Sequence, residues 1–230
     1  MNLARNFLPL IAATYFIGAI PFGLIVGRLK GIDVRTAGSG NIGATNVGRL
    51  LGKKFFFVTF VLDLSKSLLP MLVASILVSR IPEADRDWRV YLLWLLVGFA
   101  AVIGHMFSVF LKFKGGKGVA TSAGLMLGLY PYFTMPGVLA IVIFAIALFS
   151  TRYMSVASMT GACSLPLIYA IAGGLVGWPI FGAQLPLLVF AIVIALLIVY
   201  KHRGNIQRLM NGTENRFGVK RAPEESPKPS

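Results

Sequence analysis

The sequence predicts an all-α polytopic membrane protein, and three observations carry this prediction. First, 57% of the 230 residues are hydrophobic and the mean hydropathy is +0.79, far above what a soluble domain needs. Second, charged residues make up 13% of the chain, yet the formal net charge is +14, a surplus of Lys and Arg typical of cytoplasmic loops. Third, the chain contains seven apolar runs, at 7–29, 55–79, 90–111, 119–130, 137–149, 156–176 and 185–200.

The length of each run decides how it is interpreted. The first run could be mistaken for a signal peptide, but it exceeds the ~20 residues that cross a bilayer, so we expect a retained helix. Four later runs are also long enough to cross. The runs 119–130 and 137–149 are short, and Pro131 and Pro136 lie between them. The single cysteine, Cys163, lies in an apolar run, so no disulfide framework is expected.

Charge predicts the orientation of these helices. Segment 28–54 carries six Lys and Arg residues against Asp33 alone, and further basic residues occur at 112–117, at 152 and at 201–208. Segment 80–89 is balanced in charge, and segment 177–184 has no charged residue. The positive-inside rule therefore places the basic segments in the cytoplasm and the other two segments outside.

This orientation puts Lys117 and Arg152 on the same side, so an even number of crossings must separate them. Two short helices or one re-entrant pair would satisfy this condition. We expect two helices, hence seven transmembrane helices, two of them short, with an external N-terminus and a cytoplasmic C-terminus. We expect residues 1–214 to form a single integral membrane domain, and the polar residues 215–230 to form a disordered cytoplasmic tail.

A polar, glycine-rich segment at 36–49 interrupts the apolar pattern between the first two runs. Its glycines allow tight turns that bring successive backbone N–H groups to a ligand, and its other side chains add neutral donors and one guanidinium. This combination suits a phosphate, and because the segment contains no acid it does not suggest a metal site. The candidate residues are Gly38, Ser39, Gly40, Asn41, Gly43, Thr45, Asn46 and Arg49.

A second glycine-rich segment, 112–121, precedes the fourth run. Backbone N–H groups at a helix start, with a lysine beside them, form an anion site. An ATP-binding loop has the pattern Gly-x-x-x-x-Gly-Lys-Ser/Thr. Such a loop is rejected here, because Lys117 is followed by Gly118 and not by Ser or Thr. The alternative is that these lysines only set topology and bind anionic lipid. The candidate residues are Gly115, Gly116, Lys117, Gly118 and Thr121.

Two further polar segments lie on the same predicted face. In the first, Ser150 and Arg152 could contact a phosphate, or they could belong to a capped loop with an interfacial Tyr153. In the second, helical spacing brings Asn205 near Arg208. The second segment runs from His202 to Glu214.

Three ionisable residues lie inside the predicted helices. Charges in mid-membrane are costly, so Asp63 and Lys66, three residues apart, are expected to form an internal ion pair that also supports a site residue. His105 is expected to be a buried structural histidine.

Together these segments resemble one family, the bacterial acyl-phosphate-dependent glycerol-3-phosphate acyltransferases of PlsY type. The resemblance rests on the motifs at 38–49, 113–121 and 202–214 and on supporting segments at 62–66 and 151–155, and it covers nearly the whole chain. Many members have proline where this chain has Ile42 and glycine where it has Ser67. Neither position supplies a reacting group.

The resemblance implies transfer of a fatty acyl group from acyl phosphate to the 1-hydroxyl of sn-glycerol 3-phosphate, which gives lysophosphatidate and inorganic phosphate, the first acylation step of phospholipid synthesis. It implies a multi-pass protein of the bacterial cytoplasmic (inner) membrane with its active site on the cytoplasmic side, and no cofactor, metal or nucleic acid. Docking of the enzyme that produces acyl phosphate is left open. The alternative is a small transporter or translocase of an anionic solute or lipid.

The resemblance also implies roles for the site residues. No His-x-x-x-x-Asp pair is present, so catalysis is expected to rest on positioning and electrostatics. The proton of the acceptor hydroxyl passes either to His202 or to a donor phosphate oxygen, and we favour the phosphate. Acyl phosphate is assigned to Ser39, Gly40, Asn41, Gly43, Thr45 and Asn46; glycerol 3-phosphate to Arg49, Lys117, Ser150, Arg152, His202 and Asn205; catalysis to Arg49, Lys117, His202 and Asn205; and support to Asp63, Lys66, Gly115, Gly116, Gly118, Thr121, Arg208 and Glu214.

Overall fold

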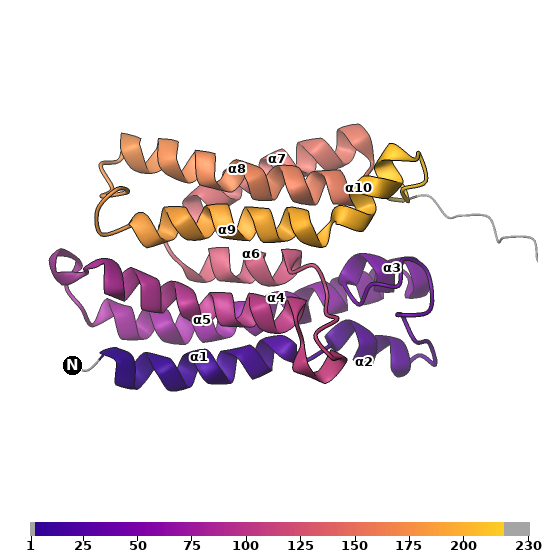
Figure 1. The fold of residues 1–230 in the computed structure, drawn as a ribbon, viewed down its shortest axis with the longest axis horizontal. Coiled ribbons are helices and arrows are strands. Elements are labelled where there is room, and N and C mark those ends of the chain that lie inside the picture. The colour runs from indigo at the N-terminus through magenta and orange to yellow at the C-terminus, as the bar shows by residue number, and fades with distance from the viewer. Residues whose placement is uncertain (1–2, 219–230) are drawn as a thin grey trace, which may run out of the picture.

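The computed structural model of the protein describes residues 3–218, and within this range all seven apolar runs are helical and no strand occurs (Figure 1). The all-α prediction is therefore confirmed. Two short 3₁₀ turns, at Glu83–Asp85 and Val109–Leu111, accompany the α-helices. The α-helices are α1 Leu3–Ala19, α2 Phe22–Arg28, α3 Ala44–Leu51, α4 Lys53–Ser79, α5 Trp88–Met106, α6 Val119–Gly128, α7 Thr134–Thr151, α8 Met154–Leu175, α9 Leu185–Lys201 and α10 Arg203–Met210.

Five described segments are long and apolar enough to cross a membrane, and α9 with α10 makes a sixth if this pair, bent by 54°, is one span. The helix α6 has only 10 residues, which corresponds to about 15 Å and falls short of a hydrocarbon core of about 30 Å. The five segments are Arg5–Arg28, Lys53–Ser79, Trp88–Leu111, Thr134–Thr151 and Met154–Leu175.

Proline explains two departures from the expected helices. The first run is not one helix, because Pro21 has no backbone N–H and separates α1 from α2. Conversely, α7 is not short. It begins at Thr134 and has 18 residues, with Pro136 in its first turn, where a missing N–H costs no hydrogen bond. Only one helix of the central pair, α6, is therefore short.

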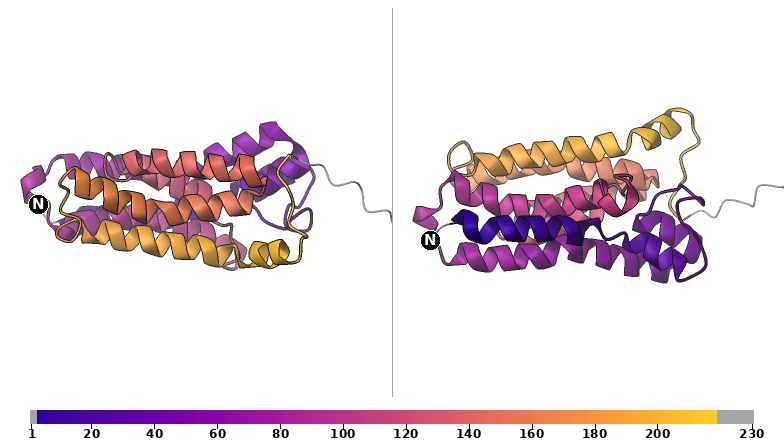
Figure 2. Two further views of the ribbon diagram at one scale, coloured as in Figure 1. Left: turned by 90° about the horizontal axis from the view of Figure 1, so that it is seen from above. Right: turned by 60° about the horizontal axis from the view of Figure 1, so that its bottom comes forward.

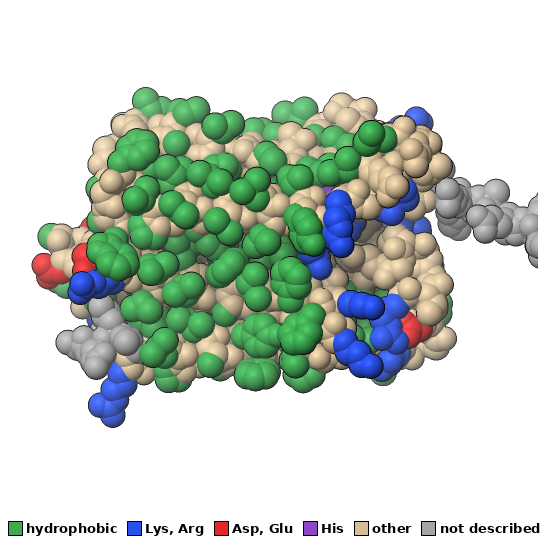
Figure 3. All heavy atoms as spheres, in the orientation of Figure 1, with side chains coloured by type: hydrophobic (Ala, Val, Ile, Leu, Met, Phe, Trp, Pro, Cys, Tyr) green, Lys and Arg blue, Asp and Glu red, His purple; other side chains and the backbone are tan. Residues whose placement is uncertain are grey.

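The helices form two groups that run nearly parallel along the long axis (Figures 1 and 2). In one group α1 packs on α5, and α4 packs on α5 and α6; in the other α8 packs between α7 and α9. One continuous hydrophobic core joins both groups and includes Met71, Trp94, Phe133 and Phe190. Large apolar side chains also cover the outer surface of the bundle, as expected of a surface that faces lipid (Figure 3).

The two ends of the bundle differ in chemistry. At the end that holds the N-terminus, the Tyr132 hydroxyl lies 2.7 Å from a Glu83 carboxylate oxygen, and the Tyr169 hydroxyl donates to Gln184 at 2.9 Å. Segments 80–89 and 177–184 therefore share one end, as the charge pattern predicts. Lys and Arg gather mainly at the opposite end, around α2, α3 and α10 (Figure 3).

The predicted tail lies only partly within the described residues. The backbone N–H of Phe217 donates to the Arg152 carbonyl at 2.6 Å, and the Arg216 guanidinium lies over the Tyr153 ring. These contacts place residues 216 and 217 against the start of α8. Residues 219–230 lie outside the described part of the chain.

Candidate functional site

A cavity of about 540 Å³ opens at the basic end of the bundle. Three segments that are far apart in the sequence line it: the loop before α3, the loop before α6, and the junction of α9 with α10. These segments carry the three motifs that the sequence analysis singled out. The lining residues are Ser39, Asn41, Lys117, Lys201, Arg203, Gly204, Asn205, Gln207 and Arg208.

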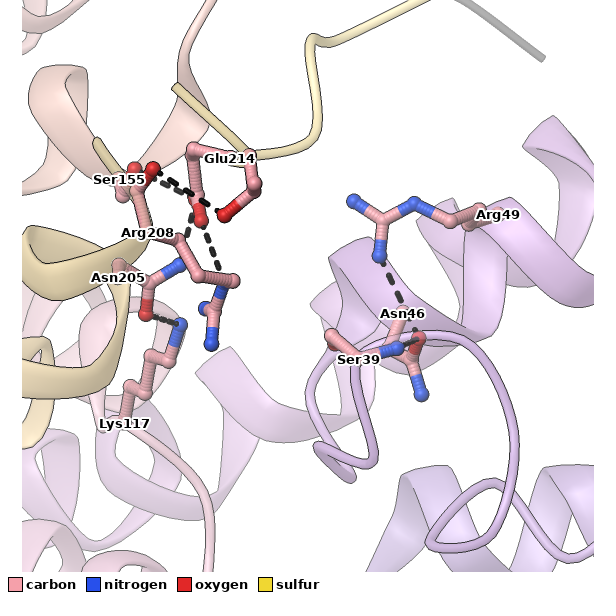
Figure 4. Close-up of polar contacts among 9 residues, drawn as sticks. Ser39, Asn46, Arg49, Lys117, Ser155, Asn205, Arg208 and Glu214 are labelled. Carbon is pink, nitrogen blue, oxygen red and sulfur yellow. Dashed lines mark hydrogen bonds and ion pairs between the residues drawn. The ribbon is translucent and has the colours of Figure 1, made fainter. Parts of the chain in front are cut away.

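The loop before α3 is organised by Asn46. This side chain is 2% exposed; its Oδ1 accepts the Ser39 N–H at 2.8 Å, and its Nδ2 donates to the carbonyls of Val34 and Asn41 at 2.9 Å each. Arg49, one turn further along α3, lies 3.5 Å from the same Oδ1 (Figure 4). Asn46 therefore fixes the shape of the loop that presents Ser39 and Asn41 to the cavity. The second half of the predicted loop, with Thr45 and Arg49, is helical.

Lys117 lies across the cavity from this loop. Gly118 follows it with a left-handed backbone (φ +80), a conformation that glycine adopts without strain, and α6 starts at the next residue. The Lys117 Nζ donates to Asn205 Oδ1 at 2.6 Å, which joins the second motif to the third (Figure 4). The predicted position of Lys117 directly before a helix is confirmed.

Glu214 holds the third motif in place. Its side chain is 6% exposed, and its carboxylate accepts from Ser155 Oγ at 2.8 Å, Asn205 Nδ2 at 2.6 Å and Arg208 Nε at 2.8 Å. Because Glu214 takes the Asn205 amide nitrogen, the Asn205 oxygen is left to face Lys117. The predicted proximity of Asn205 and Arg208 is confirmed, since both contact this one carboxylate (Figure 4).

The cavity carries a surplus of positive charge. Burial, together with the nearby Arg208, Arg49 and Lys201, lowers the pKa of Lys117 to about 8, although Glu214 opposes the shift. An anion in the cavity would relieve both the desolvation and the repulsion, so the arrangement favours a phosphate. Among the described residues no cluster of His, Cys, Asp or Glu could hold a metal ion.

His202 lies at the bend between α9 and α10 and does not line the cavity. Its Nδ1 is 2.8 Å from the Ile198 carbonyl, which can only accept, so Nδ1 carries the proton and Nε2 keeps its lone pair. Burial, and then Lys117, lower the pKa of His202 to about 4. The side chain is therefore neutral at pH 7 and holds an acceptor nitrogen near the site.

The other predicted residues fall into three sets. Ser150 and Arg152 lie at the C-terminal end of α7, outside the cavity lining, and the Ser150 hydroxyl donates to the Ile146 carbonyl of its own helix at 2.7 Å. The predicted Asp63–Lys66 ion pair is confirmed, with 2.8 Å between Nζ and Oδ1. Gly40, Gly43, Gly115 and Gly116 lie in the two loops that carry lining residues, and Thr121 lies in the first turn of α6. None of these five residues lines the cavity itself.

Several residues at the site are absent from the candidates predicted from the sequence. Lys201, Arg203 and Gln207 line the cavity only because the chain bends at His202, which helical spacing does not reveal. Ser155 supports Glu214 from a different helix. The one feature of the sequence that points to Ser155 is its place in the polar segment at 150–155.

If Lys117 binds the phosphate of the acceptor, as the resemblance implies, its pKa predicts a pH dependence for acceptor binding. Below pH 8 the ammonium is charged and attracts a phosphate dianion; above pH 8 it loses its proton while the phosphate stays dianionic, so affinity falls as pH rises. We expect the KM for a phosphorylated acceptor to rise between pH 7 and pH 9.5. In Lys117→Arg, whose guanidinium stays protonated, this rise should be much smaller. A pH-independent KM in the unmodified protein would contradict this role for Lys117.

The fold and the cavity together define an integral membrane protein with a large basic cavity at one end. A family model described as glycerol-3-phosphate acyltransferase matches residues 8–212. Relatives named glycerol-3-phosphate acyltransferase include one from Geobacter sulfurreducens, 44% identical over 214 residues (92% of this chain and 98% of the relative), and one from Geotalea daltonii, 42% identical over 211 residues (90% and 96%).

Comparison with solved structures indicates the same family. The crystal structure of PlsY (YgiH), an integral membrane glycerol 3-phosphate acyltransferase, in its glycerol 3-phosphate form is 39% identical in sequence, with a TM-score of 0.78 over 93% of this chain and 96% of that chain. Its lysophosphatidic acid form has a TM-score of 0.76. The chain belongs to the glycerol-3-phosphate acyltransferase family, which favours the enzyme over the transporter considered from the sequence.

Proposed function

We propose that this protein transfers a fatty acyl group from acyl phosphate to the 1-hydroxyl of sn-glycerol 3-phosphate, with lysophosphatidate and inorganic phosphate as products. The observation that carries the proposal is the convergence of three motifs on one basic cavity, joined by the contact between Lys117 and Asn205. The forms of the related PlsY structures, with glycerol 3-phosphate and with lysophosphatidic acid, support the acceptor and the product.

The two sides of the cavity suit two phosphates. On one side, Ser39 and Asn41 and the backbone N–H groups of their loop would hold the acyl-phosphate head, with support from Gly40, Gly43, Thr45 and Asn46. On the other side, Lys117, Asn205 and Arg208 would hold glycerol 3-phosphate. Arg49 does not line the cavity, but it contacts Asn46 and its charge acts on Lys117, so it would assist either group. Ser150 and Arg152 would take part only if the segment after α7 moved toward the cavity. The acyl phosphate is already activated, so the protein has mainly to align the hydroxyl with the carbonyl.

The proton of the attacking hydroxyl has two candidate acceptors. The free Nε2 of neutral His202 supports a role as base, whereas its burial and its absence from the cavity lining favour a donor phosphate oxygen. We expect His202→Gln to lower kcat by less than the ~10²-fold typical of losing a general base. Steady-state kinetics in both substrates measure this, and a larger loss with the KM values unchanged would assign the proton to His202.

Donor selectivity tests the reaction directly. The purified protein in detergent is incubated with glycerol 3-phosphate and with palmitoyl phosphate, palmitoyl-CoA or palmitoyl acyl carrier protein, and lysophosphatidate is quantified by mass spectrometry. Among the three donors, we expect only palmitoyl phosphate to give product, because the proposed arrangement holds two phosphates and the sequence has no His-x-x-x-x-Asp pair. Product with either thioester and none with palmitoyl phosphate would refute the proposed donor.

We also propose seven crossings, with an external N-terminus and the cavity on the cytoplasmic side of the bacterial inner membrane. The concentration of Lys and Arg around the cavity supports this orientation. The two helices between Lys117 and Arg152, α6 and α7, agree with the even number of crossings that it requires. The loop at 112–118 folds back along the end of α5, so that α6 could complete a crossing despite its 10 residues. The same basic face would attract anionic substrates, and would suit an acidic surface on the enzyme that supplies acyl phosphate.

A further inference from the structure

We propose that a cluster buried within the membrane helices, formed by Asp63, Lys66 and His105, positions the Lys117 loop for the phosphate of glycerol 3-phosphate. The inference rests on the proposed function and extends it to residues that do not touch the cavity. His105 acts here as a positioning residue, with Asp63 and Lys66 behind it.

The three side chains form one group between α4 and α5, joined by an ion pair and a hydrogen bond. The Lys66 Nζ lies 2.8 Å from Asp63 Oδ1 and 3.2 Å from His105 Nδ1, and the Asp63 oxygen lies 3.6 Å from the same ring nitrogen. The side chains of Lys66 and Asp63 are 1% and 2% exposed, and that of His105 is 4% exposed. Ionisable groups at this depth are costly and usually serve a function.

The contact with the Lys66 ammonium assigns the ring proton of the histidine. The Lys66 ammonium can only donate, so His105 Nδ1 must accept, and the ring proton is assigned to Nε2. The opposite edge of the ring therefore faces the second motif as an N–H group. A Cβ atom added to Gly116 would lie 2.2 Å from this Nε2, so the ring supports the loop at a point where no side chain fits.

The backbone of His105 and of the next residue completes the support. The His105 carbonyl accepts the Gly116 N–H at 3.0 Å, and the Met106 carbonyl accepts both the Gly115 N–H at 3.2 Å and the Lys201 ammonium at 2.9 Å. Lys117 follows Gly116 directly, and Lys201 lines the cavity. A shift of the His105 ring would therefore move the Lys117 backbone toward or away from Asn205.

A purely structural cluster would behave differently from a positioning cluster in a kinetic test. If the cluster only held α4 against α5, its loss would reduce the fraction of folded enzyme and so lower the apparent kcat, while the KM values stayed the same. If it positions Lys117, its loss should raise the KM for glycerol 3-phosphate in the enzyme that remains folded. The KM for palmitoyl phosphate should change less.

The test uses the double variant Asp63→Asn/Lys66→Met, which removes both charges together and leaves no unpaired ion in the membrane. We expect the KM for glycerol 3-phosphate to rise by about 10- to 100-fold, because small misplacements of a binding group carry penalties of this size. Ser67→Ala is the matched control on α4, since Ser67 is fully buried and its hydroxyl has no hydrogen-bond partner among residues 3–218. The single variant Lys66→Arg keeps the charge and the hydrogen-bond donors, so its KM for glycerol 3-phosphate should stay closer to that of the unmodified protein than the KM of the double variant does.

If the double variant does not fold, a double-mutant cycle of Gly116→Ala and His105→Ala tests the contact between the His105 ring and the loop. Gly116→Ala should raise the same KM, because the added methyl group displaces the loop from the His105 ring. In the background of His105→Ala, where the ring is absent, Gly116→Ala should have a clearly smaller effect, which is the signature of a direct coupling.

Two results would overturn the inference: an unchanged KM for glycerol 3-phosphate in Asp63→Asn/Lys66→Met, or strictly additive effects of Gly116→Ala and His105→Ala. Failure of the unmodified protein to use palmitoyl phosphate at all would instead refute the proposed function. The two failures are therefore distinguishable within one set of assays.

Discussion

Lys117→Met is expected to lower acyl transfer by about 10²- to 10³-fold, the range found when one charged or hydrogen-bonding group is removed from a site that stabilises a transition state. Methionine keeps the length and the apolar stem of lysine and removes only the ammonium that contacts Asn205 and gives the cavity its buried cation. The measurement is kcat/KM for glycerol 3-phosphate at pH 7 with palmitoyl phosphate in excess.

The matched control for this variant is Lys114→Met. Lys114 lies in the same loop and carries the same charge, but it is exposed and does not line the cavity. We expect a change of less than about threefold, as for other surface substitutions. Equal losses in the two variants would mean that the general positive potential of this end, rather than a specific contact of Lys117, drives binding.

Glu214→Ala is expected to destabilise the protein by roughly 1.5–3 kcal/mol and to raise the KM for glycerol 3-phosphate. The carboxylate accepts hydrogen bonds from Ser155, Asn205 and Arg208, and bonds to a charged group contribute about that much. Without Glu214, the Asn205 amide is free to turn, and the oxygen that faces Lys117 is no longer held. Thermal unfolding in detergent and steady-state kinetics measure the two effects.

Two comparisons separate stability from function at this position. Glu214→Gln keeps one acceptor oxygen, so its effects should lie between those of the unmodified protein and Glu214→Ala. Glu83→Ala removes a carboxylate bonded to Tyr132 at the opposite end of the bundle, and it should lower stability without changing the KM. A normal KM in Glu214→Ala would contradict the role of Glu214 in orienting Asn205.

Much of the fold can be predicted from local features of the sequence. Long apolar runs become helices because every backbone polar group must be satisfied inside a membrane. The Asp63–Lys66 pair could be predicted because residues three apart on a helix face each other. The break at Pro21 and the early start of α7 depend on where in a helix a proline falls. The expected single helix at 7–29 and short helix at 137–149 are therefore wrong.

The site depends more on packing between distant segments. That His105 joins the ion pair follows from the contact of α4 with α5, and that Lys201 and Arg203 line the cavity follows from the bend of 54° after α9. Neither arrangement can be derived from spacing along the chain. The grouping of Lys117 with Asn205 was predicted from the resemblance to a family, and the distance of 2.6 Å supplies its physical basis.

The measurement that tests the central claim most directly is release of inorganic phosphate from palmitoyl phosphate by the purified protein, with and without glycerol 3-phosphate. If the cavity aligns the acceptor hydroxyl with the acyl carbonyl, phosphate release should require glycerol 3-phosphate, match the lysophosphatidate formed one to one, and be lost in Lys117→Met. Phosphate release by folded protein at the same rate without the acceptor, or none in its presence, would contradict acyl transfer in this cavity.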